Sequence, residues 1–215
     1  MKVAIVDYKM SNMFSIKNAL DVVNVKSQIT FDHKTILEAD GAVLPGVGSF
    51  QEAMRHLEEL DLIDVIKEFI ACGKPFMGIC LGFQLLFTES EEFGLNKGLG
   101  VIEGNVESLS RKLTSVPVPH VGWNTVINPK LLNQQKFGPR SKIVLDDNDY
   151  YYFVHSYYVI PLDSTISIAL TGYGDFKFCS ALSHENVFAA QFHPEKSGKK
   201  GLKLYEQIKQ QINED

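Results

Sequence analysis

The first half of the chain alternates short apolar runs with segments of helical spacing, and this alternation constrains the fold more than any other feature. The runs Val3–Val6, Gly41–Leu44 and Pro75–Ile79 have the length and composition of buried strands. Helical spacing follows them in Ser11–Val23, in Phe50–Phe69 (one or two helices) and from Gln84 onward. A repeat of this kind predicts a parallel sheet with helices on both faces.

The second half of the chain has a different pattern, in which short strands are separated by turn residues. We expect strands over Ile102–Leu109, Thr125–Ile127, Tyr150–Ile160, Ile166–Tyr173, Ser180–Ser183 and Val187–Phe192, then a closing helix over Gly201–Ile212. Pro129–Asp149 is the least patterned stretch and is expected to be a loop. The predicted fold class is α/β: residues 1–215 form a single three-layer domain. A central, mostly parallel sheet is flanked by helices, and a smaller antiparallel β region occupies the second half.

Composition narrows the class of protein. The net charge is −5, from 21 Lys and Arg against 26 Asp and Glu, which argues against nucleic acid as the main partner. The longest basic cluster, Lys196–Lys203, is interrupted by glycines and a serine. No run approaches the roughly 20 apolar residues of a membrane span. Three scattered cysteines and the absence of a signal-peptide pattern predict a reduced, cytoplasmic protein.

The segment Gly78–Gly82 has the form G-x-C-x-G and lies between a predicted strand and a predicted helix. A sharp turn there would expose the Cys80 thiol, and the two glycines would remove Cβ atoms that would otherwise collide. The helix N-terminus favours a thiolate, and the amide of Leu81 is placed to donate to an oxyanion. The alternative is a buried core cysteine, which is the interpretation we give to Cys72 and Cys179.

A nucleophilic thiol needs a base, and one of the six histidines has a suitable context. His193 and Glu195 follow the apolar run Val187–Ala190, and a strand end would project both side chains to one side. The imidazole could activate the thiol, and the glutamate could orient the ring. A structural role or a metal site remains possible for His-Pro-Glu alone, although no pair of residues has close zinc-ligand spacing.

Three segments together resemble the signatures of class I (triad-type) glutamine amidotransferases. They are Pro45–Gly48, Gly78–Gln84 and Gln191–Glu195, in this order. Three further segments are similar to the glutaminase subunit of imidazole glycerol phosphate synthase, and the resemblance covers essentially the whole chain: Pro119–Asn124, Tyr152–Tyr157 and His193–Ser197.

The resemblance implies a reaction and a site. Cys80 would attack the side-chain amide of L-glutamine to form a γ-glutamyl thioester, and His193 and Glu195 would complete a Cys–His–Glu triad. The implied oxyanion hole uses Val47, Gly48 and Leu81. The positions implied to bind glutamine are Gly46, Gln84, Glu92, His155, Ser156 and Tyr157. No cofactor and no metal are implied. Without the resemblance, the His155 segment would be interpreted as a buried strand.

The resemblance also implies a partner, a (β/α)8 synthase subunit that forms a heterodimer with this chain. That subunit would receive the ammonia and make imidazole glycerol phosphate and an aminoimidazole carboxamide ribotide for histidine biosynthesis. The positions implied at the boundary are Asn12, Trp123, Asn124, Tyr152 and Lys196. The plainer interpretations are core packing for Trp123 and a solvated surface side chain for Lys196.

One loop departs from the family pattern. The family has a glycine-rich turn after the first strand, whereas this chain reads Asp7-Tyr8-Lys9-Met10-Ser11-Asn12. We expect a stiffer loop in which Asn12 caps the next helix or contacts the partner. The change leaves a paralogue open, a glutaminase that supplies ammonia for amidation of a surface sugar. We also weighed a degenerate regulatory subunit, which the intact triad disfavours, and a thiol hydrolase or peptidase, which the Pro45–Gly48 turn and Gln84 disfavour.

The resting state of the oxyanion hole is a separate hypothesis. A Gly46–Val47 peptide that points away from the site in the absence of the partner would suppress wasteful hydrolysis of glutamine.

Overall fold

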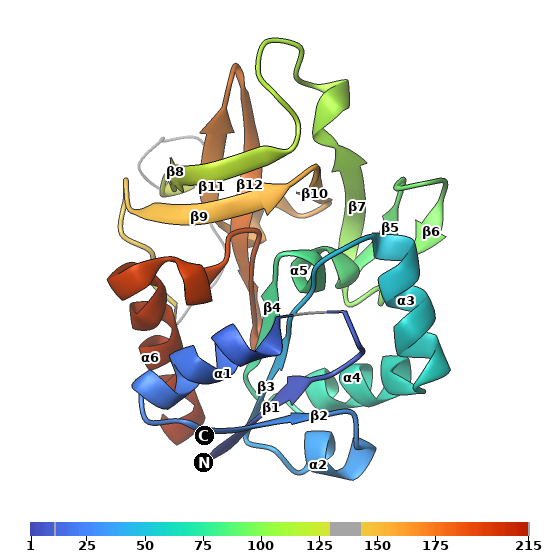
Figure 1. Ribbon diagram of the computed structural model, residues 1–215, viewed down its shortest axis with the longest axis vertical. Helices are drawn as coiled ribbons and strands as arrows, with labels where there is room; N and C mark the ends of the chain where they lie inside the picture. The colour runs from blue at the N-terminus through green and yellow to red at the C-terminus, as the bar shows by residue number, and fades with distance from the viewer. Residues whose placement is uncertain (11, 130–142, 215) are drawn as a thin grey trace.

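The computed structural model describes residues 1–10, 12–129 and 143–214, and a central sheet organises them (Figure 1). Its parallel part joins, in spatial order, β2 (Lys26–Thr30), β1 (Lys2–Val6), β3 (Gly41–Leu44), β4 (Phe76–Ile79) and β13 (Val187–Ala190). The predicted parallel sheet is confirmed. Because parallel strands share one direction, their carboxyl ends meet at one edge, where ligands of such sheets bind.

Helices cover both faces of the parallel strands. In β1, Val3 and Ile5 pack with α1 (Met13–Val22) and α6 (Gly198–Glu214) in one core. Ala4 and Val6, which point the other way, pack in a second core with α2 (His33–Leu37), α3 (Phe50–Glu59) and α4 (Leu62–Ala71). The two sets of helices flank the sheet in Figure 1. This period-two division of apolar side chains produces the three layers.

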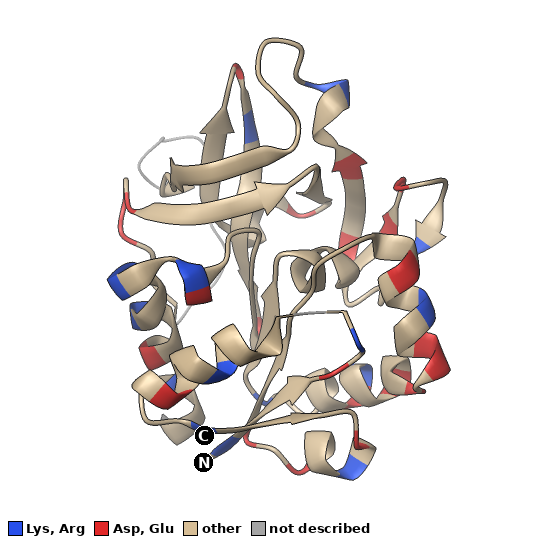
Figure 2. Ribbon diagram, viewed as in Figure 1, with Lys and Arg blue, Asp and Glu red and all other residues tan. Residues whose placement is uncertain are grey.

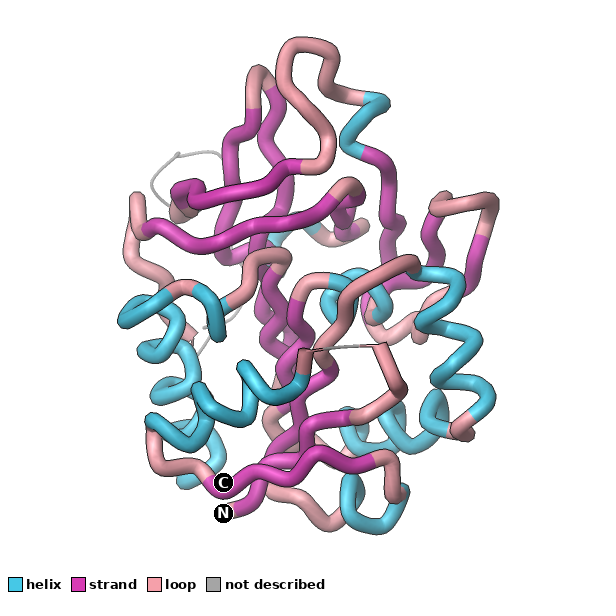
Figure 3. The backbone as a smooth tube through the Cα atoms, viewed as in Figure 1, coloured by secondary structure: helices cyan, strands magenta, loops and turns pink. Residues whose placement is uncertain are grey.

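The second half extends the same sheet with antiparallel strands. After β13 come β12 (Phe176–His184), β10 (Tyr157–Pro161), β7 (Ile102–Ser108), β5 (Phe87–Ser90) and β6 (Asn96–Lys97), and β11 (Ser167–Tyr173) pairs with β12. Within this part, only β5 and β7 run parallel. A separate ribbon, β8 (His120–Thr125) with β9 (Tyr150–His155), lies above the parallel strands in Figure 3. Short 3₁₀ turns occupy Leu109–Arg111, Ser164–Ile166 and Pro194–Lys196 (η4).

Several predicted boundaries were wrong. The helix expected from Gln84 onward is only α5 (Leu81–Leu85), because the chain then pairs with β7 as β5. The strand expected over Tyr150–Ile160 bends at Ser156 and divides into β9 and β10. The strand expected over Thr125–Ile127 is instead the end of β8, and Ile127 makes an isolated bridge to Leu170.

Other features were not predicted or cannot be compared. Strand β2 and helix α2 were missed, since β2 is largely polar. Ser11, where the first helix was expected to begin, and residues 130–142 of the expected loop lie outside the described residues. In the part of the chain that is described, no helix is long and apolar enough to cross a membrane.

Candidate active site

Cys80 occupies the turn between β4 and α5, with φ 54° and ψ −109°. Positive φ is uncommon for a residue other than glycine and costs conformational energy, which the surrounding contacts must offset. The amide of Cys80 donates to the carbonyl of Ala190 on β13 at 2.8 Å, so the strained residue remains tied to the sheet. This is the sharp strand-to-helix turn that the sequence predicts.

Close backbone packing explains the glycines around Cys80. A Cβ on Gly82 would overlap the carbonyl oxygen of Leu44, and one on Gly46 would lie 2.7 Å from Cβ of Leu81. A Cβ on Gly78 would meet Cβ of Ala189 at 3.2 Å, a tight but less severe contact. The nucleophile turn and the Pro45–Gly48 turn therefore pack directly against one another.

His193 and Glu195 form a buried pair beside the thiol. Nδ1 of His193 lies 2.7 Å from Oε1 of Glu195, and the two side chains are 3% and 4% exposed. Strand β13 ends at Ala190, before either residue, so a strand end does not align them as predicted. Instead, Pro194 begins the turn η4, and this turn brings Glu195 back to the ring.

Nε2 of His193 is buried and has no hydrogen-bond partner among the described residues. Burial opposes protonation of the ring, but the neighbouring Cys80 and Glu195 outweigh it and raise the pKa of His193 to about 10. Because Glu195 engages Nδ1, the remaining nitrogen, Nε2, is the one available for proton exchange with the sulfur. The imidazole of His193 is therefore placed to exchange a proton with the Cys80 sulfur.

A cavity of about 320 Å³ opens at Cys80. Most residues predicted to bind glutamine or to form the oxyanion hole line it: Val47, Gly48, Leu81, Gln84, Glu92, His155, Ser156 and Tyr157. Pro119 and Val154 also line it and were not predicted. Gly46 and Glu195 do not line this cavity; they line a smaller one with Asn12 and Lys196.

Two predicted glutamine-binding side chains are already oriented. The amide nitrogen of Gln84 donates to the carbonyl of Tyr157 at 3.0 Å and to Oε1 of Gln191 at 3.0 Å. Oε2 of Glu92 accepts the amide of Phe50 at 2.6 Å, at the N-terminus of α3. Burial raises the pKa of Glu92, and the Phe50 hydrogen bond partly opposes that rise. Gln84 and Glu92 both line the cavity, and an amide oxygen and a carboxyl group suit an α-ammonium group.

The predicted oxyanion donors differ in their present state. Leu81 opens α5, and its amide has no backbone acceptor among the described residues. The amide of Val47 instead donates to the carbonyl of Met10 at 3.0 Å. One donor is therefore available at the thiol, whereas the other is held by the altered loop after β1.

A chain of buried hydrogen bonds supports the far wall of the cavity. Nδ1 of His155 faces the carbonyl of Tyr157 at 2.9 Å, and Nε2 of His155 faces Nδ1 of His120 at 3.0 Å. Asn124 then contacts Nε2 of His120 at 3.2 Å. Burial lowers the pKa of His120 to about 4 and that of His155 to about 3, so both rings are neutral at pH 7. Sequence reasoning missed His120, although it stands beside Pro119 in the quoted motif.

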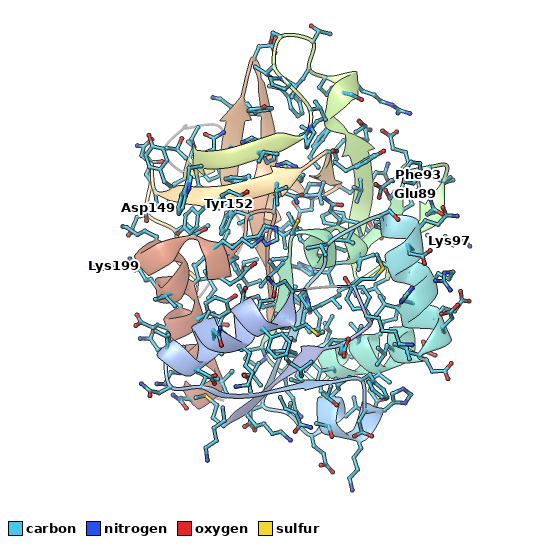
Figure 4. All side chains as sticks on the ribbon, viewed as in Figure 1. Glu89, Phe93, Lys97, Asp149, Tyr152 and Lys199 are labelled. Carbon is cyan, nitrogen blue, oxygen red and sulfur yellow. The ribbon has the colours of Figure 1, made fainter. Side chains whose placement is uncertain are left out.

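The ribbon β8–β9 presents an apolar face to solvent. Trp123 is 56% exposed and lies edge-on to Tyr152, so the core-packing alternative for Trp123 is wrong. Lys196 is exposed and lies 5.7 Å from the Tyr152 ring centroid. Figure 4 labels Tyr152 on β9, close to the start of α6. Asn124 is half-buried, with its amide on His120 and on the carbonyl of Gly172.

Asn12 and Lys196 line the same small cavity beside His193 and Glu195. Asn12 is exposed and makes no capping hydrogen bond to α1, so the predicted cap is not formed. Figure 2 shows basic residues gathered where η4 meets α6. Lys200 pairs there with Asp146 and Asp149, whereas Lys196 has no carboxylate partner among the described residues.

Hydrogen bonds from the backbone and from Ser197 connect the ribbon β8–β9 to the His193 segment. The amide of His193 donates to the carbonyl of Tyr152 at 2.9 Å. Oγ of Ser197 donates to the carbonyl of His193 at 2.6 Å and accepts the amide of Tyr152 at 3.0 Å. Sequence reasoning missed the role of Ser197, which only the pairing of β9 with the His193 segment reveals.

The remaining thiols and possible metal ligands form no second centre. Cys179 is buried, Cys72 is exposed, and neither lines the cavity. Across residues 1–10, 12–129 and 143–214, no group of three or more His, Cys, Asp or Glu side chains could hold a metal ion.

Comparisons with known proteins agree with this geometry. Residues 4–208 match the family described as glutamine amidotransferase class-I. The chain is 45% identical over 212 residues to a protein of Aquifex aeolicus named imidazole glycerol phosphate synthase subunit HisH, covering 97% of this chain and 96% of the relative. A protein of the same name from Geobacter sulfurreducens is 42% identical over 207 residues, covering 94% and 95%.

Solved structures share the fold at low identity. A crystal structure described as a glutamine amidotransferase aligns with TM-score 0.72 and 16% identity over 98% of both chains. A structure described as PurLQS from Thermotoga maritima aligns with TM-score 0.68 and 17% identity over 97% of both chains. With the family match spanning nearly its whole length, the chain belongs to the class I glutamine amidotransferases.

Proposed function

We propose that this chain is the glutaminase subunit of an imidazole glycerol phosphate synthase. It hydrolyses L-glutamine at Cys80 and passes ammonia to a (β/α)8 synthase subunit. The observation that carries the proposal is the strained Cys80 turn facing the buried His193–Glu195 pair at one cavity. Relatives of matching length that are named as this subunit support the choice of pathway. We also propose that residues 1–215 act as one amidotransferase domain in the cytoplasm.

The site residues act in a sequence of proton transfers. The Cys80 sulfur attacks the amide carbon of glutamine, and the C–N bond breaks as imidazolium His193 protonates the departing nitrogen. Ammonia leaves, and a γ-glutamyl thioester remains on Cys80. Neutral His193 then takes a proton from water, which attacks the thioester and releases glutamate. Glu195 orients the ring and stabilises its charged form.

The oxyanion hole completes this mechanism only when the Val47 amide becomes available. Leu81 supplies one donor, and the second is the amide of Val47, now bonded to Met10. We propose that this bond suppresses hydrolysis in the isolated chain and that the synthase subunit releases it. Loss of one oxyanion donor typically slows such enzymes by about 10²–10³-fold, which sets the scale of the expected activation.

The synthase subunit is proposed to dock on the exposed face of β8–β9 and the adjoining turn. Trp123 and Tyr152 offer an exposed aromatic pair, Lys196 offers a cation, and Asn12 lies next to the small cavity behind the triad. Aromatic and basic residues of this kind are common anchors of interfaces. Asn124 lies on the same ribbon and connects this face to the His120–His155 pair.

The test mixes the chain with the barrel subunit of the histidine pathway and measures binding, glutamine hydrolysis and cyclisation. We expect a stable complex and an increase of roughly 10²–10³-fold in hydrolysis over the isolated chain. A chain that is active alone and forms no complex would contradict the proposal. The sugar-amidation paralogue would then be tested with its own barrel partner, but no observation on this chain favours it.

The nucleophile is tested by Cys80→Ser in that complex. We expect glutamine hydrolysis to fall by about 10⁴-fold or more, because a serine hydroxyl is not ionised by this histidine. Cyclisation with added ammonium should persist, which provides the control for intact folding and docking. Full glutaminase activity in Cys80→Ser would show that the wrong nucleophile has been assigned.

A further inference from the structure

Gln191 is a fully buried amide that directly faces the nucleophile. Its Nε2 lies 3.7 Å from Sγ of Cys80, and its residue is 0% exposed. Its backbone amide donates to the carbonyl of Ser180 at 2.9 Å, which anchors the residue just beyond the end of β13. A buried amide is costly unless both of its polar atoms are bonded, so its neighbours determine how it is oriented.

The orientation of the Gln191 amide follows from the carbonyl of Tyr157, to which Gln191 is connected through Gln84. The carbonyl of Tyr157 can only accept, so the atom of Gln84 that faces it must be the nitrogen. The same nitrogen lies 3.0 Å from Gln191, where it must meet the amide oxygen. The atom of Gln191 turned toward Cys80 is therefore Nε2, which is a donor and cannot accept.

A donor that cannot accept discriminates between the two forms of the sulfur. A thiolate accepts its hydrogen bond strongly, whereas a thiol is a weak acceptor and directs its own proton elsewhere. The sulfur of Cys80 lies 3.8 Å from the carbonyl oxygen of Val154, a separate, long contact to which a thiol would donate. A hydrogen bond made only to the charged form stabilises that form.

We propose that Gln191 is a further catalytic residue, whose amide donates to the Cys80 sulfur and stabilises the attacking thiolate. Gln84 holds it in that orientation, so Gln84 acts on the nucleophile as well as on glutamine. His193 is the proton carrier for the same sulfur, whereas the Gln191 amide donates a hydrogen bond and does not titrate. The inference rests on the proposed glutaminase function for its kinetic consequence, but its effect on the thiol does not require glutamine.

The test measures alkylation of Cys80 by iodoacetamide as a function of pH in the full chain. The Cys80 peptide is followed by mass spectrometry, because Cys72 is exposed and would be alkylated too. In Gln191→Leu, we expect the midpoint to rise by about one pH unit, a tenfold loss of thiolate at pH values below it. Gln191→Glu should raise the midpoint further, because a carboxylate would repel the thiolate. The matched control is Thr171→Val, a buried polar-to-apolar change away from the cavity, which should leave the midpoint unchanged.

The kinetic counterpart is a fall in kcat for glutamine of about tenfold with KM changed less than twofold. A folded Gln191→Leu variant with the midpoint of the unaltered chain would overturn the proposal. If both variants fail to fold, the side-chain amide of Gln191 can be followed by NMR in the unaltered chain. Its resonances should shift with the alkylation midpoint of Cys80, and their invariance would overturn the proposal. Failure of the proposed function would appear separately, as an unaltered chain that does not hydrolyse glutamine with its partner.

Discussion

The nucleophile turn and the Pro45–Gly48 turn face the same cavity, yet they are held by different contacts. Around Cys80, backbone atoms are packed so closely that Gly82 could not carry a Cβ, and buried amides and imidazoles support the walls. In the Pro45–Gly48 turn, Val47 is 43% exposed, and its amide is held by the carbonyl of Met10.

This difference separates the residues proposed for the reaction from the residues proposed to regulate it. The side of the cavity that carries Cys80, the proposed nucleophile, is closely packed and hydrogen-bonded within this chain. The side that carries Val47, the proposed second oxyanion donor, is held by one hydrogen bond to Met10, and one such bond contributes about 1 kcal/mol net. A partner that binds near Asn12 could shift the second without disturbing the first.

The largest effect expected on the packed side comes from Gly82→Ala. The added Cβ would overlap the carbonyl of Leu44, so the nucleophile turn must shift, at a cost of about 3 kcal/mol or more in unfolding free energy. Denaturant unfolding measures the loss, and glutaminase activity should fall with it. The control is Gly172→Ala on β11, where a Cβ would have no atom within 4 Å. Equal stability of the two variants would show that the turn can relax.

A smaller effect concerns the buried histidines behind Tyr157. Their folded-state pKa values lie below the ordinary value near 6.5, so the unfolded chain binds more protons than the folded chain. Their contribution to stability is therefore complete above about pH 6.5 and is lost as the pH falls toward 4. Each histidine should contribute a slope of about 1.4 kcal/mol per pH unit in that window.

The variant His120→Asn isolates one of these groups. Asparagine retains a donor near the position of Nδ1 but does not titrate, so the slope of unfolding free energy between pH 6.5 and 4.5 should decrease by about 1.4 kcal/mol per pH unit. Chemical denaturation at several pH values measures it. His33→Asn, at an exposed site with a single backbone contact, is the control. An unchanged slope in His120→Asn would mean that burial does not hold His120 neutral in the folded chain.

The smallest effect tests the Pro45–Gly48 turn through Lys9, which lies in the loop that carries Met10. Lys9 has φ 70°, so glycine would relieve its strain and make the loop that carries Met10 more mobile. In Lys9→Gly we expect glutamine hydrolysis without the partner to rise about two- to fivefold, because the Val47 amide is released more often. Glu185→Gly, at φ 52° on a turn remote from Cys80, is the matched control. No increase, or an equal increase in both, would show that the loop does not control the oxyanion hole.

The helix expected after Gln84 and the missed strand β2 show where pattern reasoning fails. Residues from Phe87 have the local pattern of a continuing helix, but they become strand β5 because β7 offers a parallel partner. Strand β2 has the largely polar run Lys26–Thr30, and it forms because β1 pairs with it along its whole length. Pairing over long sequence distance overrides local preference in both cases.

The site also combines features that local sequence patterns predict with contacts that only the folded chain forms. Cys80, His193 and Glu195 could be proposed from short segments, and the structure brings them together, although by a 3₁₀ turn and not by a strand end. Gln191 stands two residues before His193 and begins the Gln191–Glu195 signature, but the sequence carries no signal that its side chain faces the sulfur. Its contact with the sulfur joins positions 111 residues apart, which no local pattern reports.

The sequence by itself determined the strands β1, β3 and β4 with the helices α1, α3 and α4, the place of Cys80 between Gly78 and Gly82, and the family. These depend on apolar spacing and on backbone requirements that act over a few residues. Only the tertiary structure decided which atom each buried amide presents, because hydrogen-bond partners are assigned by the packed neighbours. It alone placed the Val47 amide on Met10 and the Gln191 amide on Cys80, and these two contacts carry the two proposals, control by the loop after β1 and stabilisation of the thiolate.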